Sequence, residues 1–206
     1  MPTGEPMRCR WRPARRIAGT TTLVLLAAAT AARAQDPPVP SDLQYTMLAK
    51  VLTYDRNLRS RAGDELVIAV VYQESFPASN AAMKAFEDAY AGSRFHAIDV
   101  MPIRIVSIAL RDLDRLEKQL REKQADVVYL APLRAVAPEA VAHAATRAGA
   151  LTVTGVPEYV SQGAAVGFGL EAGRPKVLID AVLAREQGAD FSSRLLAMAE
   201  LVRKGP

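Results

Sequence analysis

Buried strands and amphipathic helices alternate along the middle of the chain. Residues 65–72 form a nearly continuous apolar and β-branched run, which is typical of a strand buried on both faces of a parallel sheet. Residues 111–124 have the clearest helical period, with Leu113, Leu116 and Leu120 on one side. The whole pattern predicts strands at 65–72, 101–110, 126–130 and 151–154, with helices at 79–91, 111–124 and 138–148. This order favours right-handed crossovers and a parallel sheet.

The pattern changes at both ends of that region. A stripe of apolar residues predicts a helix from 41 to about 54, and a charged segment with a glycine predicts a loop at 57–64. Two strand-like runs, 164–171 and 174–179, are joined by Ala172 and Gly173 and indicate an antiparallel hairpin. Two helices are expected at the end, at 181–187 and 192–204. We therefore predict an α/β fold: a single domain with a largely parallel sheet, flanked by helices, and a C-terminal antiparallel hairpin.

The basic residues are concentrated at the start of the chain. The sequence has 26 Lys and Arg residues against 22 Asp and Glu residues. Residues 1–34 contain six of the basic residues and one of the acidic ones, so the other 172 residues carry 20 basic and 21 acidic side chains and a net charge near −1. A nucleic-acid-binding domain needs a basic face on its folded part. The charge distribution therefore argues against nucleic acid as a partner.

The first 34 residues have the pattern of a signal peptide. A basic segment ending at Arg16 precedes an apolar run at 17–29, and small residues at Ala32 and Ala34 predict cleavage after Ala34. The apolar run is shorter than the roughly 20 residues of a membrane span, although an uncleaved anchor is the alternative. We expect an exported, periplasmic protein with no stable membrane insertion after cleavage. It would consist of a proline-rich leader at 35–41 and a domain at 42–206.

The sequence offers little that points to catalysis. Its single cysteine, Cys9, precedes the expected cleavage point, so the mature chain has no disulfide, zinc–thiolate site or cysteine nucleophile. The two histidines, His96 and His143, are 47 positions apart and are not grouped with carboxylates at metal-ligand spacing. No glycine-rich phosphate loop follows the first strand, and no G-x-S-x-G motif is present. We expect no enzymatic activity, no cofactor and no metal site.

Polar residues follow several predicted strands. Gln73 comes after the first strand of the alternating region, Arg134 after the third, and Thr154 at the end of the fourth. Open α/β sheets bind ligands beyond the carboxyl ends of their strands, so these three side chains are candidates for lining a cleft. Arg134 is the candidate for holding an anion. The alternative is that these residues only cap helices and form turns.

Six short segments of the expected mature chain form a recognisable order. They are AKVLTY at 49–54, VVYLA at 127–131, LTVTG at 151–155, GAAVGF at 163–168, RPKVLIDA at 174–181 and GADFSSRLLAMA at 188–199. In this order the chain resembles the YfiR-like family of periplasmic proteins, over roughly residues 43–203 and most strongly from residue 151 onward. Two features depart from the family pattern. The mature chain lacks the family's disulfide cysteines, so redox control is not carried over, and Asp180 replaces the usual asparagine.

The resemblance implies a regulator that acts by binding. The type member binds the periplasmic sensing domain of an inner-membrane diguanylate cyclase and so restrains cyclic-di-GMP synthesis and biofilm formation, while other members are associated with sensor kinases. A homodimer would also fit the family. For such a regulator we expect an exposed apolar patch on the opening helix around Tyr45, Met47 and Tyr54. The alternative function is a periplasmic small-molecule-binding module that uses the strand-end residues.

Overall fold

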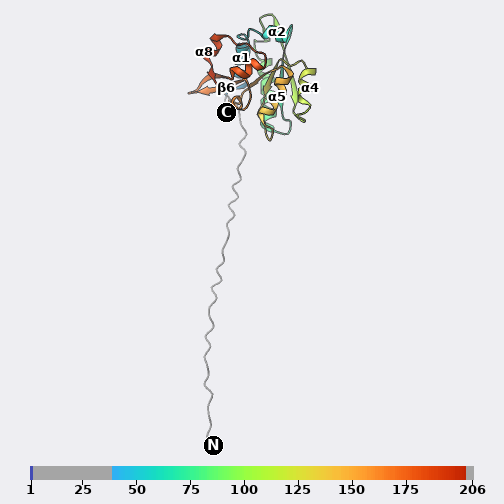
Figure 1. Cartoon of the computed structure of the whole chain (residues 1–206), viewed down its shortest axis with the longest axis vertical. Coiled ribbons are helices and arrows are strands. Elements are labelled where there is room, and N and C mark those ends of the chain that lie inside the picture. Colours follow the sequence, from blue (N-terminus) through green and yellow to red (C-terminus); the bar gives the residue numbers. More distant parts are fainter. Residues whose placement is uncertain (2–38, 203–206) are drawn as a thin grey trace. The chain divides into compact units, whose positions relative to one another are not determined.

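The computed structural model describes Met1 and residues 39–202 (Figure 1). Contacts divide the chain into two units, Met1–Ala32 and Arg33–Pro206, and the description below concerns the second. The predicted signal peptide and its cleavage point after Ala34 lie outside the described residues apart from Met1, as do residues 35–38 of the leader. No helix within the described residues is long and apolar enough to cross a membrane.

The core of the fold is one eight-stranded sheet in the order β2-β3-β1-β4-β5-β6-β7-β8. The five strands from β3 to β6 in that order are mutually parallel, while β2 is antiparallel to β3 and β7 is antiparallel to β6. The strands are β1 (Leu66–Tyr72), β2 (Ala97–Ile98), β3 (Met101–Ala109), β4 (Val127–Leu130), β5 (Leu151–Thr154), β6 (Val166–Glu171), β7 (Arg174–Ile179) and β8 (Glu200–Leu201). The predicted single-domain α/β class with a C-terminal hairpin is confirmed.

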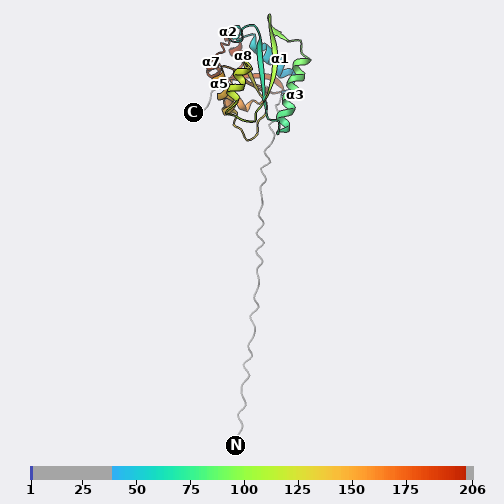
Figure 2. The ribbon, with the colours of Figure 1, turned by 90° about the vertical axis from the view of Figure 1, so that its right-hand side faces the viewer.

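Helices cover both faces of this sheet. The helices are α1 (Ser41–Leu52), α2 (Leu58–Ala62), α3 (Pro77–Ala91), α4 (Leu116–Glu122), α5 (Pro138–Ala148), α6 (Glu158–Ser161), α7 (Ala181–Glu186) and α8 (Ser193–Met198). Side chains of α1, α3 and α8 belong to one hydrophobic core, and those of α4, α5 and α6 belong to the other. In Figure 2, α3 and α5 accordingly lie on opposite sides of the strands.

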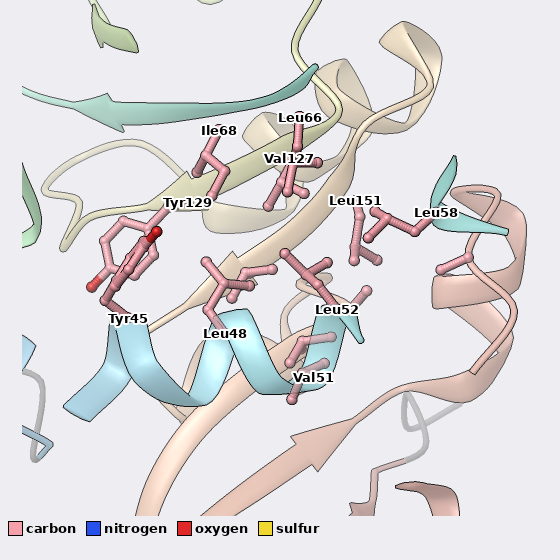
Figure 3. Close-up of a cluster of buried hydrophobic side chains, with 14 of the residues drawn as sticks. Tyr45, Leu48, Val51, Leu52, Leu58, Leu66, Ile68, Val127, Tyr129 and Leu151 are labelled. Atoms are coloured by element: carbon pink, nitrogen blue, oxygen red, sulfur yellow. The ribbon is translucent and has the colours of Figure 1, made fainter. Parts of the chain in front are cut away.

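The first helix is unusually deep in the structure. Its residues Tyr45, Leu48 and Leu52 are fully buried and point towards the sheet, where they meet residues of β1, β4 and β5 (Figure 3). Beyond α1, the C-terminal segment adds Phe191 and Leu195 to the same core. Helix α1 is therefore enclosed between the sheet and the C-terminal segment, and only part of its surface can face another molecule.

Three predicted segments differ most from the structure, each for a physical reason. The expected loop at 57–64 contains the short helix α2, which Leu58 anchors in the core. The helix expected at 111–124 begins only at Leu116, because Asp112 accepts a hydrogen bond from the Asp114 N–H and holds a turn before it. The helix expected at 192–204 ends at Met198, where the backbone becomes extended and the next residues pair with β7 as β8.

Candidate functional site

The predicted partner patch on α1 is only partly at the surface. Tyr45 does not lie on it: the side chain is buried, and its ring packs edge-on against Phe86 and Tyr90 at 5.6 and 5.7 Å. Its hydroxyl donates a hydrogen bond to the Phe95 carbonyl, and burial raises its pKa above the ordinary value. Tyr45 is thus a core residue, and it is not part of an exposed apolar patch.

Met47 and Tyr54, in contrast, line a shallow apolar groove of about 210 Å³. We call this the α1–α8 groove, and its lining residues are Met47, Lys50, Val51, Tyr54, Val177, Leu195, Met198 and Ala199. They come from α1 and the turn after it, from β7, and from α8 and its C-cap. The side chain of Met198 is the most open apolar group here, with 62% of its surface exposed. The groove joins two parts of the chain that the sequence separates by more than a hundred residues.

Local capping holds α8 in position beside α1. The Ser192 hydroxyl accepts a hydrogen bond from the Leu195 N–H, as expected for a residue that caps a helix. The Ser192 N–H in turn donates to the Tyr54 carbonyl at 2.9 Å, which fixes the start of α8 to the end of the α1 segment. At the other end, β8 pairs with β7. Met198 is therefore presented from a short helix that is fixed at both ends.

Exposed apolar surface continues from this groove onto the hairpin. In the β6–β7 pairing, Leu170 faces Pro175, and two residues further along Phe168 faces Val177. Alternate residues of a strand point to the same side of a sheet, so Leu170 lies on the same face as Val177 of the groove. Leu170 is 41% exposed. The apolar surface thus extends from α8 across β7 to the tip of the hairpin.

The strand-end residues form a second candidate site. The structure brings Gln73 and Arg134 together: the Gln73 Oε1 accepts a hydrogen bond from the Arg134 backbone N–H at 2.6 Å. It keeps Thr154 apart from them, because Thr154 is buried, its hydroxyl donates to the Leu130 carbonyl, and it accepts from the Val156 N–H. Thr154 thus fastens β5 to β4 and offers no group to a ligand.

A cavity of about 450 Å³ lies beside Gln73 at the carboxyl ends of β1 and β3. Its lining consists of Gln73, Glu74, Ser75, Leu110, Arg111, Leu113 and Val136. Arg111 and Glu74 form an exposed ion pair across it, at 2.8 Å. Neither Arg134 nor Thr154 lines this cavity, so Arg111 is the cation that a ligand would meet there.

The histidines and acidic side chains of the described residues are not gathered into a metal site. No three His, Cys, Asp or Glu residues within it are close enough together to hold a metal ion. His143 faces Glu139 one helical turn away at 3.7 Å, and the His96 ring packs edge-on against Tyr90. The α1–α8 groove offers apolar surface, and the cavity at the strand ends offers mixed polar and apolar surface.

Sequence reasoning missed Met198 and Val177. In the helix expected at 192–204, Met198 lies three residues after Leu195 and four before Val202, which places it on the apolar side of that helix. The spacing alone therefore favours a buried Met198, and only the structure shows that it is exposed. Val177 gives no signal of its own, because its place in the groove depends on the packing of α8 over β7.

A protein-family model matches most of this chain. The model of the YfiR/HmsC-like family matches residues 54–200. The matched segment begins at the end of the α1 segment and includes all strands except the last residue of β8. No curated protein matches the chain in sequence.

Solved structures show a similar fold at low sequence identity. One is a conserved domain protein from Vibrio cholerae, which is 15% identical with a TM-score of 0.53 over 80% of this chain and 60% of that one. Another is an ABC domain from Streptococcus pneumonia in complex with L-Trp, which is 10% identical with a TM-score of 0.52 over 79% and 62% of the two chains. The present chain spans about three fifths of the length of these neighbours, and at such identities the likeness concerns the fold alone.

Proposed function

Because the chain belongs to the YfiR/HmsC-like family, we propose that it is an exported, non-enzymatic regulator that binds the periplasmic part of an inner-membrane signalling protein. The partner would be of the diguanylate cyclase or sensor kinase type, and the output would be cyclic-di-GMP signalling and biofilm formation in the first case. The family supports this proposal because its members are periplasmic regulatory proteins.

The observation that carries the proposal is the α1–α8 groove with Met198 exposed at its rim. Exposed apolar side chains that are grouped together are a feature of protein-binding sites. Methionine suits a partner surface because its unbranched side chain adapts to the shape that it meets. Lys50, at the edge of the groove, adds one positive charge that would favour an acidic rim on the partner.

Replacement of Met198 by glutamate tests this assignment in the cell. A buried carboxylate in an apolar contact is strongly unfavourable, so we expect Met198→Glu to weaken partner binding at least tenfold. If the partner is a repressed cyclase, cells that carry this variant as their only copy will accumulate cyclic-di-GMP and form more biofilm. Cellular cyclic-di-GMP is measured by mass spectrometry beside the thermal stability of the purified variant.

Val100→Glu is the matched control for that experiment. Val100 is 77% exposed in the turn between β2 and β3, so the same chemical change is made outside the groove. The control is expected to behave as the unmodified protein. If both variants are folded and present in equal amount, equal cyclic-di-GMP levels would show that the α1–α8 groove is not the partner-binding site.

A second candidate function is supported by the strand-end cavity. Ligand sites of small molecules commonly measure about 300–1,000 Å³, and the cavity at Gln73 and Arg111 falls within this range at about 450 Å³. A small-molecule-binding module would place an anionic group on Arg111. A thermal-shift screen of metabolites against the protein and its Arg111→Ala variant distinguishes the functions. A ligand that stabilises only the unmodified protein favours the small-molecule-binding module. The absence of a thermal shift in both proteins favours the regulator.

A further inference from the structure

A cavity of about 590 Å³ lies between α5, α7 and the end of β8. Its volume is within the range of about 300–1,000 Å³ that is common for small-molecule sites. Apolar side chains form much of its wall, and two of them, Val182 and Leu201, are 68% and 55% exposed. None of its lining residues lines the α1–α8 groove or the strand-end cavity, so this cavity is separate from both.

Hydrogen bonds between distant segments hold the walls of this cavity. The Gln187 Nε2 donates to the Thr146 hydroxyl at 2.9 Å, which joins the end of α7 to α5. The Oε1 of the same side chain accepts from the Thr152 N–H of β5 at 2.8 Å. At the end of β8, the Val202 N–H donates to the Ile179 carbonyl at 2.9 Å. The helices around the cavity are therefore fixed to the sheet and to each other.

Asp180 supplies the cavity with an acceptor that the protein itself does not use. The residue is only 7% exposed and directly precedes α7. Its Oδ1 accepts hydrogen bonds from the Val182 and Leu183 N–H groups, at 3.1 and 3.0 Å, and so caps the helix. The other carboxylate oxygen accepts no hydrogen bond within residues 39–202, and it is not among the fully enclosed atoms that lack a partner there. This oxygen is consequently accessible from the cavity that Asp180 lines.

The side chains around Asp180 give the cavity a negative charge. Glu139 and Glu186 also line it, and no lysine or arginine does so among the described residues. His143 is the remaining titratable residue of the lining, and it faces Glu139 at 3.7 Å. A carboxylate with little access to water is stabilised by an opposite charge. The cavity is therefore complementary to a cation.

The lining also indicates what kind of cation fits. A metal ion is not expected, because no three His, Asp or Glu residues of the described segment are close enough together to hold one. Quaternary ammonium groups are typically held by aromatic cages, and no Phe, Tyr or Trp within residues 39–202 lines the cavity. An ammonium group that carries hydrogens can instead donate a charge-assisted hydrogen bond to a carboxylate oxygen. The apolar wall then suits the hydrocarbon part of an organic amine.

We propose that this cavity binds a small organic amine. The ammonium group donates a hydrogen bond to the unused oxygen of Asp180, and the apolar part of the molecule covers Val182 and Leu201. Binding thus removes two exposed apolar side chains from water and gives a largely buried carboxylate its counter-charge. The strand-end cavity would take the opposite ligand charge, because Arg111 lines it. The inference does not depend on the proposed regulatory partner, since it uses neither of the sites described above.

Three probes that share a phenylbutyl skeleton test the charge of the ligand. They are 4-phenylbutylamine, 4-phenylbutan-1-ol and 4-phenylbutanoate, and isothermal titration calorimetry measures each against the purified protein. We expect the amine to bind with a Kd below about 1 mM, and the alcohol and the carboxylate to bind at least about tenfold more weakly. An alcohol that binds as tightly as the amine would contradict the role of Asp180. An amine that shows no binding at several millimolar would overturn the proposal.

Asp180→Asn removes the charge and keeps the helix cap. Asparagine can accept both backbone hydrogen bonds with its own Oδ1 and caps helices as well as aspartate does, and thermal unfolding checks that the variant is folded. We expect its affinity for 4-phenylbutylamine to fall by about tenfold or more, because a hydrogen bond to a charged group is lost. Asp114→Asn is the matched control, since Asp114 is exposed in the turn before α4 and does not line the cavity. Equal affinities of the two variants would overturn the inference.

The chain's own cations are the competing occupant of the cavity. Arg203 and Lys204 follow Val202 in the sequence, and Val202 lines the cavity. The double variant Arg203→Gln/Lys204→Gln removes both charges without shortening the chain. We expect it to bind 4-phenylbutylamine with an affinity within about tenfold of the unmodified protein, because salt screens charges that do not contact the ligand. A larger rise in affinity would assign the Asp180 carboxylate to one of these side chains and would overturn the small-molecule ligand.

Discussion

Replacement of Asp55 by asparagine is expected to lower the free energy of unfolding by about 4 kcal/mol. Asp55 is buried and forms an ion pair with Arg61 at 3.0 Å, with side-chain exposures of 0% and 10%. Its other carboxylate oxygen accepts hydrogen bonds from the backbone N–H groups of Asn57 and Asp190 at 3.0 and 2.8 Å. One side chain thus joins the segment after α1 to the loop before α8.

The expected loss is large because Arg61 would remain buried without its counter-charge. The Arg61 guanidinium also donates to the Asp126 carbonyl at 2.9 Å, which holds the arginine in place beside β4. Removing one partner of a buried pair generally costs more than the pair contributes, since the remaining charge is poorly solvated. Because Asp55 fastens the loop that leads into α8, the same substitution is also expected to loosen the α1–α8 groove.

Asp190→Asn is the control for this prediction. Asp190 forms an ion pair with Arg56 at 3.7 Å in the same corner, but their side chains are 52% and 61% exposed. An exposed pair of this kind contributes less than about 1 kcal/mol. Chemical denaturation of both variants provides the measurement, and equal losses would contradict the distinction between the two pairs.

Replacement of Gly155 by alanine is expected to cost about 3 kcal/mol of stability. A Cβ at this position would lie 2.1 Å from Gln44 Oε1 and 2.6 Å from both other atoms of that amide. Gln44 is buried, and its amide donates to the Val39 carbonyl and accepts from the Tyr129 hydroxyl. The amide cannot move aside without leaving both of these buried groups unpaired, and each such group costs about 1–3 kcal/mol.

Gly92→Ala is the matched substitution at a position with space. There the nearest atom to an added Cβ is the Asp88 carbonyl oxygen at 3.4 Å, which is an ordinary contact, and the backbone is α-helical with φ of −81°. This change is expected to be neutral or slightly stabilising. Thermal unfolding of both variants tests the pair. A Gly155→Ala protein as stable as Gly92→Ala would show that Gln44 moves freely.

Local signals explain why much of the fold could be predicted. The helix expected at 138–148 matches α5, Pro138–Ala148, because it has a proline in its first turn and ends at Gly149, which adopts a left-handed φ of 80°. The hairpin of β6 and β7 follows from two strand-like runs around a short turn. Local signals also predicted α8, but the predicted end of this helix was wrong because Glu200 and Leu201 pair with β7, which is distant in the sequence.

The candidate sites were less predictable, since they depend on contacts between distant segments. Gln73 and Arg134 meet because they follow adjacent parallel strands, β1 and β4, as the topology requires. Tyr45 was misplaced because it lies on the same side of α1 as Leu48, towards the sheet, where residues of α3 cover its ring. That cover comes from a different helix, which the residues around Tyr45 do not reveal. Thr154 was also misplaced, because the sequence gives no sign that its hydroxyl is engaged in hydrogen bonds to the Leu130 carbonyl and the Val156 N–H.

Site-specific crosslinking in the native cell envelope tests the central claim most directly. A photoreactive amino acid replaces Met198 at the α1–α8 groove, and in a control chain it replaces Lys123, an exposed residue at the end of α4. We expect the Met198 position to capture one inner-membrane protein with a cytoplasmic cyclase or kinase domain, and the Lys123 position not to capture it. Capture of the same proteins from both positions, or of no membrane protein from Met198, would contradict it.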